Sequence, residues 1–489
     1  MLFNSHIFML LFLPLLLAGW YFLNWKKKFQ LAQGYLIGMS LWFYAYANLQ
    51  YLWLLLFSCL IGWLLSCLPE KISSEKGKKV LTGVGCVLHL GLLGYFKYSN
   101  FFLENLNTVF HTDFPMLQIL LPVGISFYTF QQLAYLIDRC RGDAPRDSFF
   151  DYLTFMVYFP QLLQGPILLR SEFMGQLKEP ERRRFHVERF SEGIQFFVFG
   201  LAKKVLLADT LAKAVNYGYS NVSMLDSISA LLLAVGYLTE LYFDFSGYCD
   251  MAVGLGKMIG LEVAENFDAP FHSASVKEFW RRWHMTLGRF FTRYVYIPLG
   301  GNRRGKMRTL CNVMIVMLLS GLWHGAAWTF VLWGFLHGVG MIWDNLEHPH
   351  LPKKWMRQAA TFAYVCMTFV FFRAESIAQG VDVLKSIVSL KWNGFVFQMA
   401  SALDMTECYI ITKALSMKLP GLLSWFWLGI FVVLIAICFR VLSGEKVSGV
   451  VALQRQKGYG RLYPVLLAVL FTWSMISMTG VSEYLYFSF

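Results

Sequence analysis

Residues 7–23 read IFMLLFLPLLLAGWYFL, an apolar run that contains no charged side chain. A helix needs about 20 such residues to cross the hydrocarbon core of a bilayer. The run ends near Trp25 and the lysines at positions 26–28, an aromatic and basic boundary that is typical of a helix end on the cytosolic face. Since the run lacks the basic start and the cleavage site of a signal peptide, we expect a retained first membrane span.

The composition extends this expectation to the whole chain. Its 489 residues are 57% hydrophobic and 15% charged, whereas ordinary soluble domains carry about 25% charged residues. These values exclude a disordered chain, a disulfide scaffold, a coiled coil and a soluble two-domain enzyme. Continuous apolar runs also argue against an outer-membrane barrel, whose strands alternate apolar and polar residues. We therefore expect an all-α, polytopic membrane protein, with room for roughly ten or more spans.

The charge of the chain indicates contact with a membrane surface. Its 43 Lys+Arg and 30 Asp+Glu give a formal net charge of +13, and the basic residues gather between the apolar runs. This is the distribution expected of cytosolic loops that meet anionic headgroups. The nine cysteines lie far apart and form no C-x-x-C pair, which argues against a metal site. The lipid bilayer is the expected partner, with no nucleic acid and no metal.

Hydropathy divides the rest of the chain into further spans and connections. An external loop is predicted at residues 100–115, and a basic cytosolic patch is predicted at residues 178–189. Spanning helices are predicted at residues 31–47, 49–68, 80–96, 118–137, 193–212, 228–245, 362–372, 423–439 and 462–478.

One apolar segment does not read as a straight helix. Residues 155–169, FMVYFPQLLQGPILL, carry two prolines and a glycine, and proline removes a backbone donor from a helix. Broken helices at membrane depth survive only where they are buried in protein or line a wet cavity. We therefore predict a re-entrant segment here.

The first candidate for chemistry is His324, within the apolar stretch MIVMLLSGLWHGAAW of residues 314–328. An ionisable side chain in such a run indicates function by default, because an isolated polar group in hydrocarbon is costly. The alternative is a structural histidine that bonds across helices, and periodicity alone does not separate the two. His337 is rotated by about 140° from His324 on a straight helix, so it is predicted to be structural or interfacial.

Residues 277–294 predict one amphipathic helix at the membrane interface. Arg282 and Arg289 share a basic face, while Trp280 and Trp283 lie on the other side, where His284 is also expected. The basic face could anchor the helix to lipid, hold the phosphates of a cytosolic donor or bind an acidic carrier protein.

Two carboxylates, Asp244 and Asp250, lie in the apolar sequence YFDFSGYCD of residues 242–250. Buried carboxylates need partners, and nearby arginines are the predicted ones. The chain contains no G-x-S-x-G, H-x-x-x-D or H-E-x-x-H motif, so neither a serine triad nor a zinc mechanism finds support.

Several of these stretches together resemble the membrane-bound O-acyltransferase family, with the alginate O-acetylation branch as the nearest. The motifs are LPVGISFYTFQ (121–131), FPQL (159–162), FDFSGY (243–248), FWRRWH (279–284), YVYIPLGGN (294–302), GLWHGAAW (321–328) and FFRA (371–374). Ala327 departs from the pattern, since this branch often has Asn there.

The resemblance implies a helical bundle with re-entrant segments around a through-membrane tunnel. A thioester donor, acetyl-CoA or an acyl carrier, would enter from the cytosol as a substrate, and no permanently bound cofactor is expected. The catalytic histidine of the family corresponds to His324, and the second motif histidine corresponds to His284. Predicted substrate-contacting residues are Ser126, Gln131, Asp244, Ser246, Asn266, Arg281, Arg282 and Trp323.

The function that the resemblance implies is O-acyl transfer, most simply of acetyl, to a hydroxyl of an exported cell-surface polysaccharide or of an extracellular or periplasmic acetyl-handling protein. His324 would act as the general base, and the location would be a bacterial plasma membrane. Residues 1–374 would form the catalytic core, and residues 375–489 a polar connection with the last spans. The alternatives are D-alanyl transfer from a carrier protein toward teichoic acid, a transporter that uses His324 as a proton relay, and a membrane scaffold.

Overall fold

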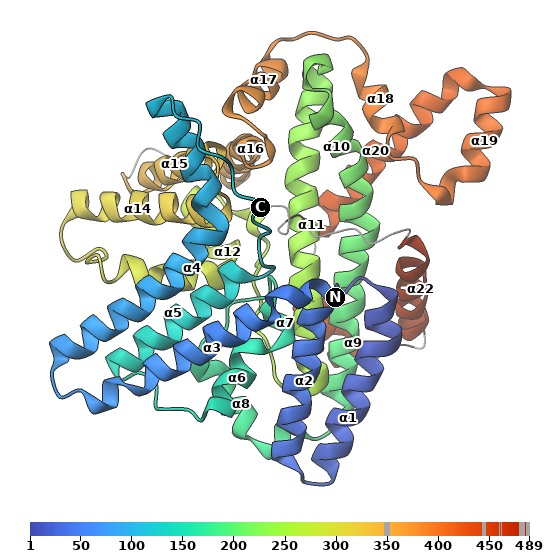
Figure 1. The fold of residues 1–489 in the computed structure, drawn as a ribbon. Coiled ribbons are helices and arrows are strands. Elements are labelled where there is room, and N and C mark those ends of the chain that lie inside the picture. The colour runs from blue at the N-terminus through green and yellow to red at the C-terminus, as the bar shows by residue number, and fades with distance from the viewer. Residues whose placement is uncertain (347–352, 443–445, 459, 461, 479–484, 486–489) are drawn as a thin grey trace. The chain divides into compact units, whose positions relative to one another are not determined.

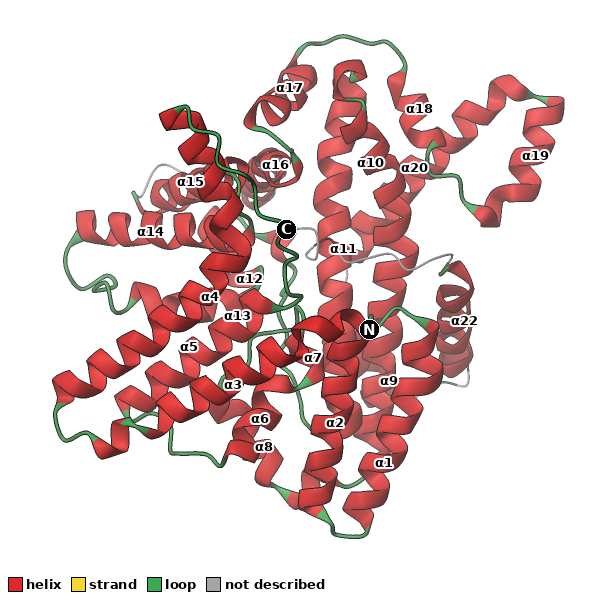
Figure 2. Ribbon diagram, in the orientation of Figure 1, coloured by secondary structure: helices red, strands yellow, loops and turns green. Residues whose placement is uncertain are grey.

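A computed structural model describes residues 1–346, 353–442, 446–458, 460, 462–478 and 485. These residues form helices joined by loops and contain no strand (Figure 2). Six helical segments among them are long and apolar enough to cross a membrane, which confirms the prediction of an all-α polytopic membrane protein. They are Phe8–Trp25, Leu49–Lys71, Glu75–Phe110, Ser227–Ile259, Lys306–His324 and Pro420–Leu442.

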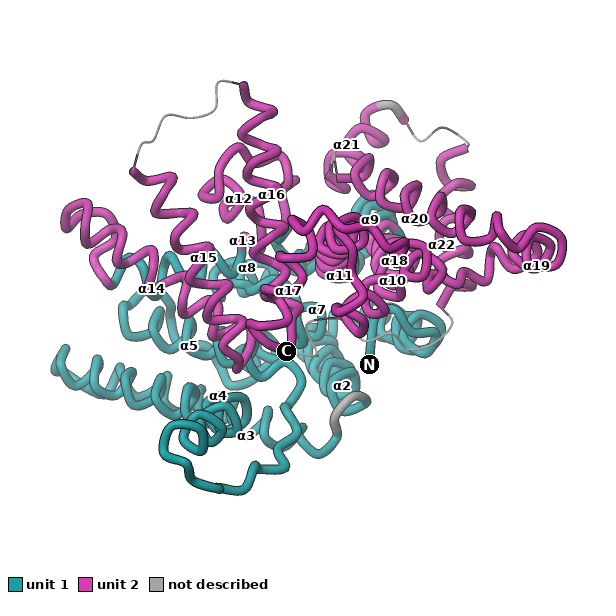
Figure 3. The backbone as a smooth tube through the Cα atoms, turned by 90° about the horizontal axis from the view of Figure 1, so that it is seen from above, with its two compact units in different colours: residues 1–198, 248–266, 286–298 teal, residues 199–247, 267–285, 299–489 magenta. Residues whose placement is uncertain are grey.

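The chain divides into two compact units that are not contiguous in sequence (Figure 3). Unit 1 comprises Met1–Val198, Tyr248–Asn266 and Thr286–Pro298. Unit 2 comprises Phe199–Gly247, Phe267–Met285 and Leu299–Phe489. The long helix α11 (Ser227–Ile259) contributes residues to both. The predicted boundary at residue 374, between a catalytic core and a C-terminal part, is not tested by this division. The two units are defined by contacts between residues, whereas the predicted boundary is placed where the motifs end.

Unit 1 is built from helices that pack as neighbours in the chain, among them α1 against α2 and α4 against α5 (Figure 1). Its core contains a cluster of phenylalanines, in which Phe159 lies 5.5 Å from both Phe12 and Phe43, measured between ring centroids. The helices are α1 (Leu13–Trp25), α2 (Phe29–Asn48), α3 (Leu52–Cys67), α4 (Glu75–Phe110), α5 (Ile125–Arg141), α6 (Phe149–Val157), α7 (Phe159–Leu162), α8 (Arg170–Lys178) and most of α9 (Val187–Ala202).

The predicted break near residues 155–169 is present. Helix α6 ends at Val157, α7 spans Phe159–Leu162 only, and the next helix begins at Arg170. The turn after α7 needs Gly165, because a Cβ there would overlap the Pro160 carbonyl oxygen. The break follows from the sequence as argued, and the re-entrant placement of this segment in a bilayer stays a prediction.

Two predicted boundaries in unit 1 are wrong. Helix α4 runs from Glu75 to Phe110, so most of the predicted external loop at residues 100–115 is helical. The reason is local, because the sequence has no glycine or proline between Tyr95 and Pro115 and the helix continues until His111, whose φ is 53°. Helix α5 starts at Ile125 and not at residue 118.

Unit 2 contains the helical hairpin α14–α15 and the helices that pack on it, including α16 and α12. Its predicted last spans are confirmed as helices at α20 and α22. The helices are α10 (Asp209–Ser220), α12 (Val276–Arg282), α14 (Lys306–His324), α15 (Trp328–Asn345), α16 (Lys354–Arg373), α17 (Ile377–Val388), α18 (Phe395–Ser401), α19 (Tyr409–Lys418), α20 (Pro420–Leu442), α21 (Val447–Lys457) and α22 (Leu462–Ser477), with the π-helical turn η5 (Lys203–Ala208) before α10.

The α14–α15 hairpin is held by close backbone contact at two glycines. A Cβ on Gly321 would overlap the Phe330 carbonyl oxygen, and a Cβ on Gly334 would lie 2.5 Å from the Met317 carbonyl oxygen. Small residues at such crossings let helix backbones approach closely in membranes.

The variant Gly321→Ala is therefore expected to destabilise the protein by about 1–3 kcal/mol, as overpacking does. The measurement is the thermal unfolding midpoint of the purified protein in detergent. Gly91→Ala is the matched control, because nothing lies within 4 Å of a Cβ at Gly91 on α4. Equal midpoints for the two variants would contradict this account of the crossing.

Candidate active site

His324 is the last residue of α14. The helix stops there because Gly325 is extended, with φ −158° and ψ 151°, and α15 begins at Trp328. Gly325 is required by space, since a Cβ would overlap the Phe330 ring. The imidazole therefore lies at a helix end beside a tight turn, although it is only 3% exposed.

Three aromatic rings surround the His324 imidazole. Their centroids lie 4.9 Å away for Trp323, 5.1 Å for Trp333 and 5.2 Å for Phe372. They come from α14, α15 and α16. The ring plane is therefore fixed by packing, which is what a positioned acid or base needs.

His284 lies at a break in the chain and not within a helix. Helix α12 ends at Arg282 and α13 (Met285–Phe291) begins after His284, whose φ is 45°. The prediction of one amphipathic helix over residues 277–294 is therefore wrong.

The physical reason for this break is the burial of Trp283. Its side chain is 1% exposed and packs against Phe279 at 5.4 Å and Phe267 at 5.1 Å between ring centroids. A left-handed histidine is strained by about 1–3 kcal/mol, and burying a large aromatic side chain in the core offsets that cost.

Trp323 connects the two candidate histidines. Its ring centroid lies 6.1 Å from that of His284 and 4.9 Å from that of His324. His284 also contacts Phe245 at 4.8 Å. The structure thus brings His284, Trp323 and His324 together inside unit 2, as residues of one aromatic cluster. Burial lowers the pKa of His284, which lies between helices, to about 3, so this imidazole is neutral at pH 7.

Asp244, on helix α11, is buried and belongs to a cluster of ion pairs. Lys204 Nζ lies 2.6 Å from Asp244 Oδ1 and 2.8 Å from Asp209 Oδ1, and Leu485 N donates to Asp244 Oδ2 at 3.1 Å. The prediction of pairing is confirmed, but the partner is a lysine and not one of the nearby arginines. Sequence reasoning missed Lys204, although a lysine pair inside the apolar run at residues 193–212 is the kind of signal that marks a functional or paired site.

The other candidates of unit 2 differ in their surroundings. Ser246 is 2% exposed, and its Oγ has no hydrogen-bond partner among the residues that the structure describes. Arg282 pairs with Glu278 at 2.8 Å. Arg281 is exposed, so its charge is available to an anionic ligand.

Three candidates belong to unit 1. Asn266 is buried, and its Oδ1 accepts hydrogen bonds from Thr286 N at 3.1 Å and from Thr286 Oγ1 at 3.0 Å, a tie between chain segments. Ser126 is buried in the first turn of α5. Gln131 is 3% exposed, and neither of its amide atoms has a partner in the described ranges. A buried unpaired amide requires an explanation, and a ligand contact would supply one.

His337 has the structural surroundings predicted for it. Trp280 Nε1 donates to His337 Nδ1 at 3.3 Å, and His337 Nε2 lies 2.9 Å from Thr368 Oγ1. Since indole N–H only donates, Nδ1 is the acceptor and the proton of the neutral ring is on Nε2. Both nitrogens are therefore used in joining α12, α15 and α16.

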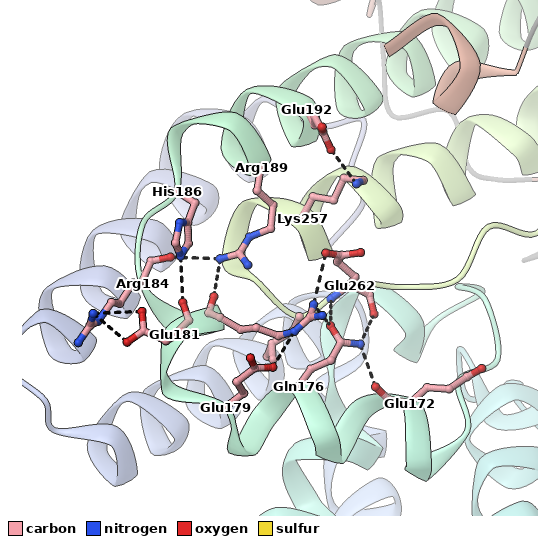
Figure 4. Close-up of polar contacts among 12 residues, drawn as sticks. Glu172, Gln176, Glu179, Glu181, Arg184, His186, Arg189, Glu192, Lys257 and Glu262 are labelled. Atoms are coloured by element: carbon pink, nitrogen blue, oxygen red, sulfur yellow. Dashed lines mark hydrogen bonds and ion pairs between the residues drawn. The ribbon is translucent and has the colours of Figure 1, made fainter. Parts of the chain in front are cut away.

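The predicted basic patch at residues 178–189 is largely neutralised by carboxylates and carbonyls (Figure 4). Arg182 pairs with Glu179 at 3.0 Å and with Glu262 at 3.4 Å, and Arg184 pairs with Glu181 at 2.8 Å. Arg189 donates to backbone carbonyls of the same loop. These arginines fasten the loop, so they are poor candidates for holding a donor phosphate.

The structure is that of a multi-pass helical membrane protein in which two buried imidazoles lie on either side of a tryptophan. Comparison with known proteins agrees with a multi-pass membrane protein. The family model for the membrane-bound O-acyltransferases matches residues 141–379. The peptidoglycan O-acetyltransferase of Helicobacter pylori is 35% identical over 423 residues, covering 80% of each chain. The probable alginate O-acetylase of Azotobacter vinelandii is 39% identical over 389 residues, covering 77% of this chain and 76% of the relative.

A more distant relative is the teichoic acid D-alanyltransferase of Bacillus subtilis, 28% identical over 271 residues, which cover 52% of this chain and 69% of the relative. The chain belongs to the membrane-bound O-acyltransferase family. It is an O-acyltransferase, which confirms the class of enzyme expected from the motifs.

Proposed function

We propose that this enzyme moves an acetyl group from a cytosolic thioester, acetyl-CoA or an acetylated carrier protein, to a hydroxyl group on the outer side of a bacterial plasma membrane. The observation that carries the proposal is the cluster of His284, Trp323 and His324, which holds an imidazole at the end of α14 within an aromatic cage. Two bacterial relatives are named as a peptidoglycan O-acetyltransferase and a probable alginate O-acetylase, and these names support acetyl as the transferred group.

In this mechanism His324 accepts the proton of the acceptor hydroxyl as its oxygen attacks the thioester carbonyl carbon. The tetrahedral intermediate collapses, the carbon–sulfur bond breaks, and the imidazolium returns the proton to the leaving thiolate. The products are an ester and a thiol, so atoms and charge balance. His284 is proposed to orient or polarise the donor carbonyl.

Of the other candidates in unit 2, Ser246 is supported as a substrate contact by its buried Oγ, which has no partner among the described residues. Arg281 is supported by its exposed charge. Asp244, Asn266 and Arg282 have partners inside the protein, so structural roles suit them better. The acceptor is proposed to be a cell-surface polysaccharide, reached directly or through an acetyl-handling partner protein.

D-alanyl transfer is the second candidate, and the 28% identity to a teichoic acid D-alanyltransferase favours it over unrelated chemistry. The transporter and scaffold alternatives lose support because the relatives carry names of acyltransferases.

Reconstitution in liposomes tests the proposal. The protein is supplied on its cytosolic side with radiolabelled acetyl-CoA, acetylated carrier protein or D-alanylated carrier protein, and label on a polysaccharide acceptor is measured. Label from an acetyl donor is expected. Transfer of D-alanine alone would favour the second candidate, and solute flux without any transfer would reject both.

A further inference from the structure

A cluster of four exposed basic side chains lies where α14 begins, and we call it the α14 basic cluster. Its members are Arg303, Arg304, Lys306 and Arg308. The sequence has no aspartate or glutamate between Glu278 and Asp344, so no acid close in the chain balances these charges. Among the residues that the structure describes, none of the four forms an ion pair. The cluster therefore differs from the loop at residues 178–189, whose arginines are already paired.

The turn that carries the cluster has a fixed shape. Asn312 is buried, and its Nδ2 donates to the Gly301 carbonyl oxygen at 2.9 Å. Arg303 N donates to the Gly300 carbonyl oxygen at 3.1 Å. Gly300 has a φ of 107°, which glycine adopts without strain, and the side chain of Arg304 lies against it. The cations are thus presented on an ordered turn, which lowers the entropy cost of binding an anion.

An exposed apolar stripe begins beside the cluster and continues along α14. Met307, which lies between Lys306 and Arg308, is 75% exposed, and Cys311 is exposed one turn later. The stripe continues through Ile315 and Leu319. Its members are spaced by four residues, so they share one face of the helix. Since α14 is long and apolar enough to cross a membrane, this face is suited to contact with lipid chains.

The two features together indicate one class of ligand. Basic residues at the start of a spanning helix are expected at the cytosolic face, and that leaflet carries anionic lipids. A phospholipid has a phosphate for the cations and acyl chains for the stripe, whereas a soluble phosphate or an acidic protein would use the cations alone. Lys306 precedes His324 by about 27 Å of helix at 1.5 Å per residue, so the cluster is separate from the candidate active site.

We propose that the α14 basic cluster binds the headgroup of an anionic phospholipid of the cytosolic leaflet, with an acyl chain lying along the stripe from Met307 to Leu319. Arginine binds phosphate through two parallel N–H groups and lysine binds it as a point charge. The lipid holds the start of the helix whose last residue is His324. This inference does not depend on the proposed function, because no residue of the cluster or the stripe is assigned to acyl transfer.

Lipid binding to the full chain tests this inference. The protein is purified in a neutral detergent, and dissociation constants for phosphatidylglycerol, cardiolipin and phosphatidylethanolamine are measured by native mass spectrometry. The first two lipids are anionic and are expected to bind at least about tenfold more tightly than phosphatidylethanolamine, which has no net charge. Equal affinities for the three lipids would overturn the proposal.

A double variant assigns the binding to the cluster. Arg303→Gln/Arg304→Gln is expected to weaken cardiolipin binding about 30-fold, at about fivefold for each cation that is removed. The control is Arg184→Gln/Lys385→Gln, which removes the same charge from exposed positions that already have carboxylate partners and is expected to change little. All four positions are exposed, so the unfolding midpoints should match. Equal affinities of the two double variants for cardiolipin would show that the cluster is not the site.

Two competitors identify the occupant. Glycerol phosphate presents the phosphate without acyl chains, and apo acyl carrier protein is an acidic protein without a lipid tail. Neither is expected to displace cardiolipin at a concentration at which phosphatidylglycerol displaces it. Displacement by glycerol phosphate would make the cluster a site for soluble phosphates. Displacement by the carrier protein, lost in Arg303→Gln/Arg304→Gln, would make it a protein-docking surface. Either result would overturn the assignment of a phospholipid.

Discussion

Replacing His324 by alanine is expected to lower the turnover number for acetyl transfer by about 10²–10⁴, the usual contribution of a general base. The imidazole is held by Trp323, Trp333 and Phe372, so no other side chain can swing into its place. Since the base acts in the transition state, the turnover number should fall while the Michaelis constant for the acceptor changes little.

The comparison needs a histidine variant that leaves the cluster intact. His186→Ala is suitable, because His186 is an exposed residue of the arginine-rich loop in unit 1. His186→Ala should keep the unfolding midpoint of the wild type within about 2 °C, since surface changes usually cost less than about 0.5 kcal/mol. His324→Ala removes a buried side chain, so its turnover is measured on a monodisperse sample well below its own unfolding midpoint. Turnover by His324→Ala within threefold of His186→Ala would remove the base assignment.

The membrane class and the main spans were predictable because they depend on local composition. The runs that became α1, α3 and α20 are apolar over nearly their whole lengths, and no tertiary contact is needed to recognise them. The break after Val157 was also predictable, since Pro160 and Gly165 act through the backbone of their own neighbours. His324 could be selected as a candidate from the sequence because a lone ionisable group in an apolar run is conspicuous.

The geometry around His284 was not predictable in the same way. In a helical-wheel projection, residues 277–294 separate into an apolar and a basic face. In the structure the chain turns at His284, and Trp283 enters the aromatic core. The stabilisation of buried Trp283 comes from its contacts with Phe267 and Phe369, which lie outside this segment of the sequence. Periodicity within one segment carries no information about such contacts.

The partner of Asp244 was missed for a related reason. Arginines near residue 281 are closer in sequence to the polar motif than Lys204 is, but helix packing brings Lys204 of η5 against α11. The π-helical turn, a local irregularity that often occurs at functional sites, aims the lysine at two carboxylates, and the sequence gives no sign of its register. The noncontiguous units depend on the same long-range packing.

The Lys204 cluster supports the second large prediction. Lys204→Met is expected to destabilise the protein by about 3–5 kcal/mol, the cost of leaving buried charges without their partner. The side chains of Lys204 and Asp244 are each 2% exposed, so the carboxylates that lose their partner stay largely shielded from bulk water. The measurement is unfolding of the purified protein by denaturant or heat in detergent, with Lys385→Met as the control, because Lys385 pairs with Asp382 on an exposed surface.

A compensating change distinguishes charge from lost packing. Asp244→Asn removes one of the stranded carboxylates, so the double variant Lys204→Met/Asp244→Asn should recover a measurable part of the loss, with a coupling of about 0.5–3 kcal/mol between the two sites. If instead the two losses simply add, the pair contributes only through packing. In that case Asp244 would have to be neutral in the folded protein, since an ionised carboxylate would be coupled to the ammonium group of Lys204.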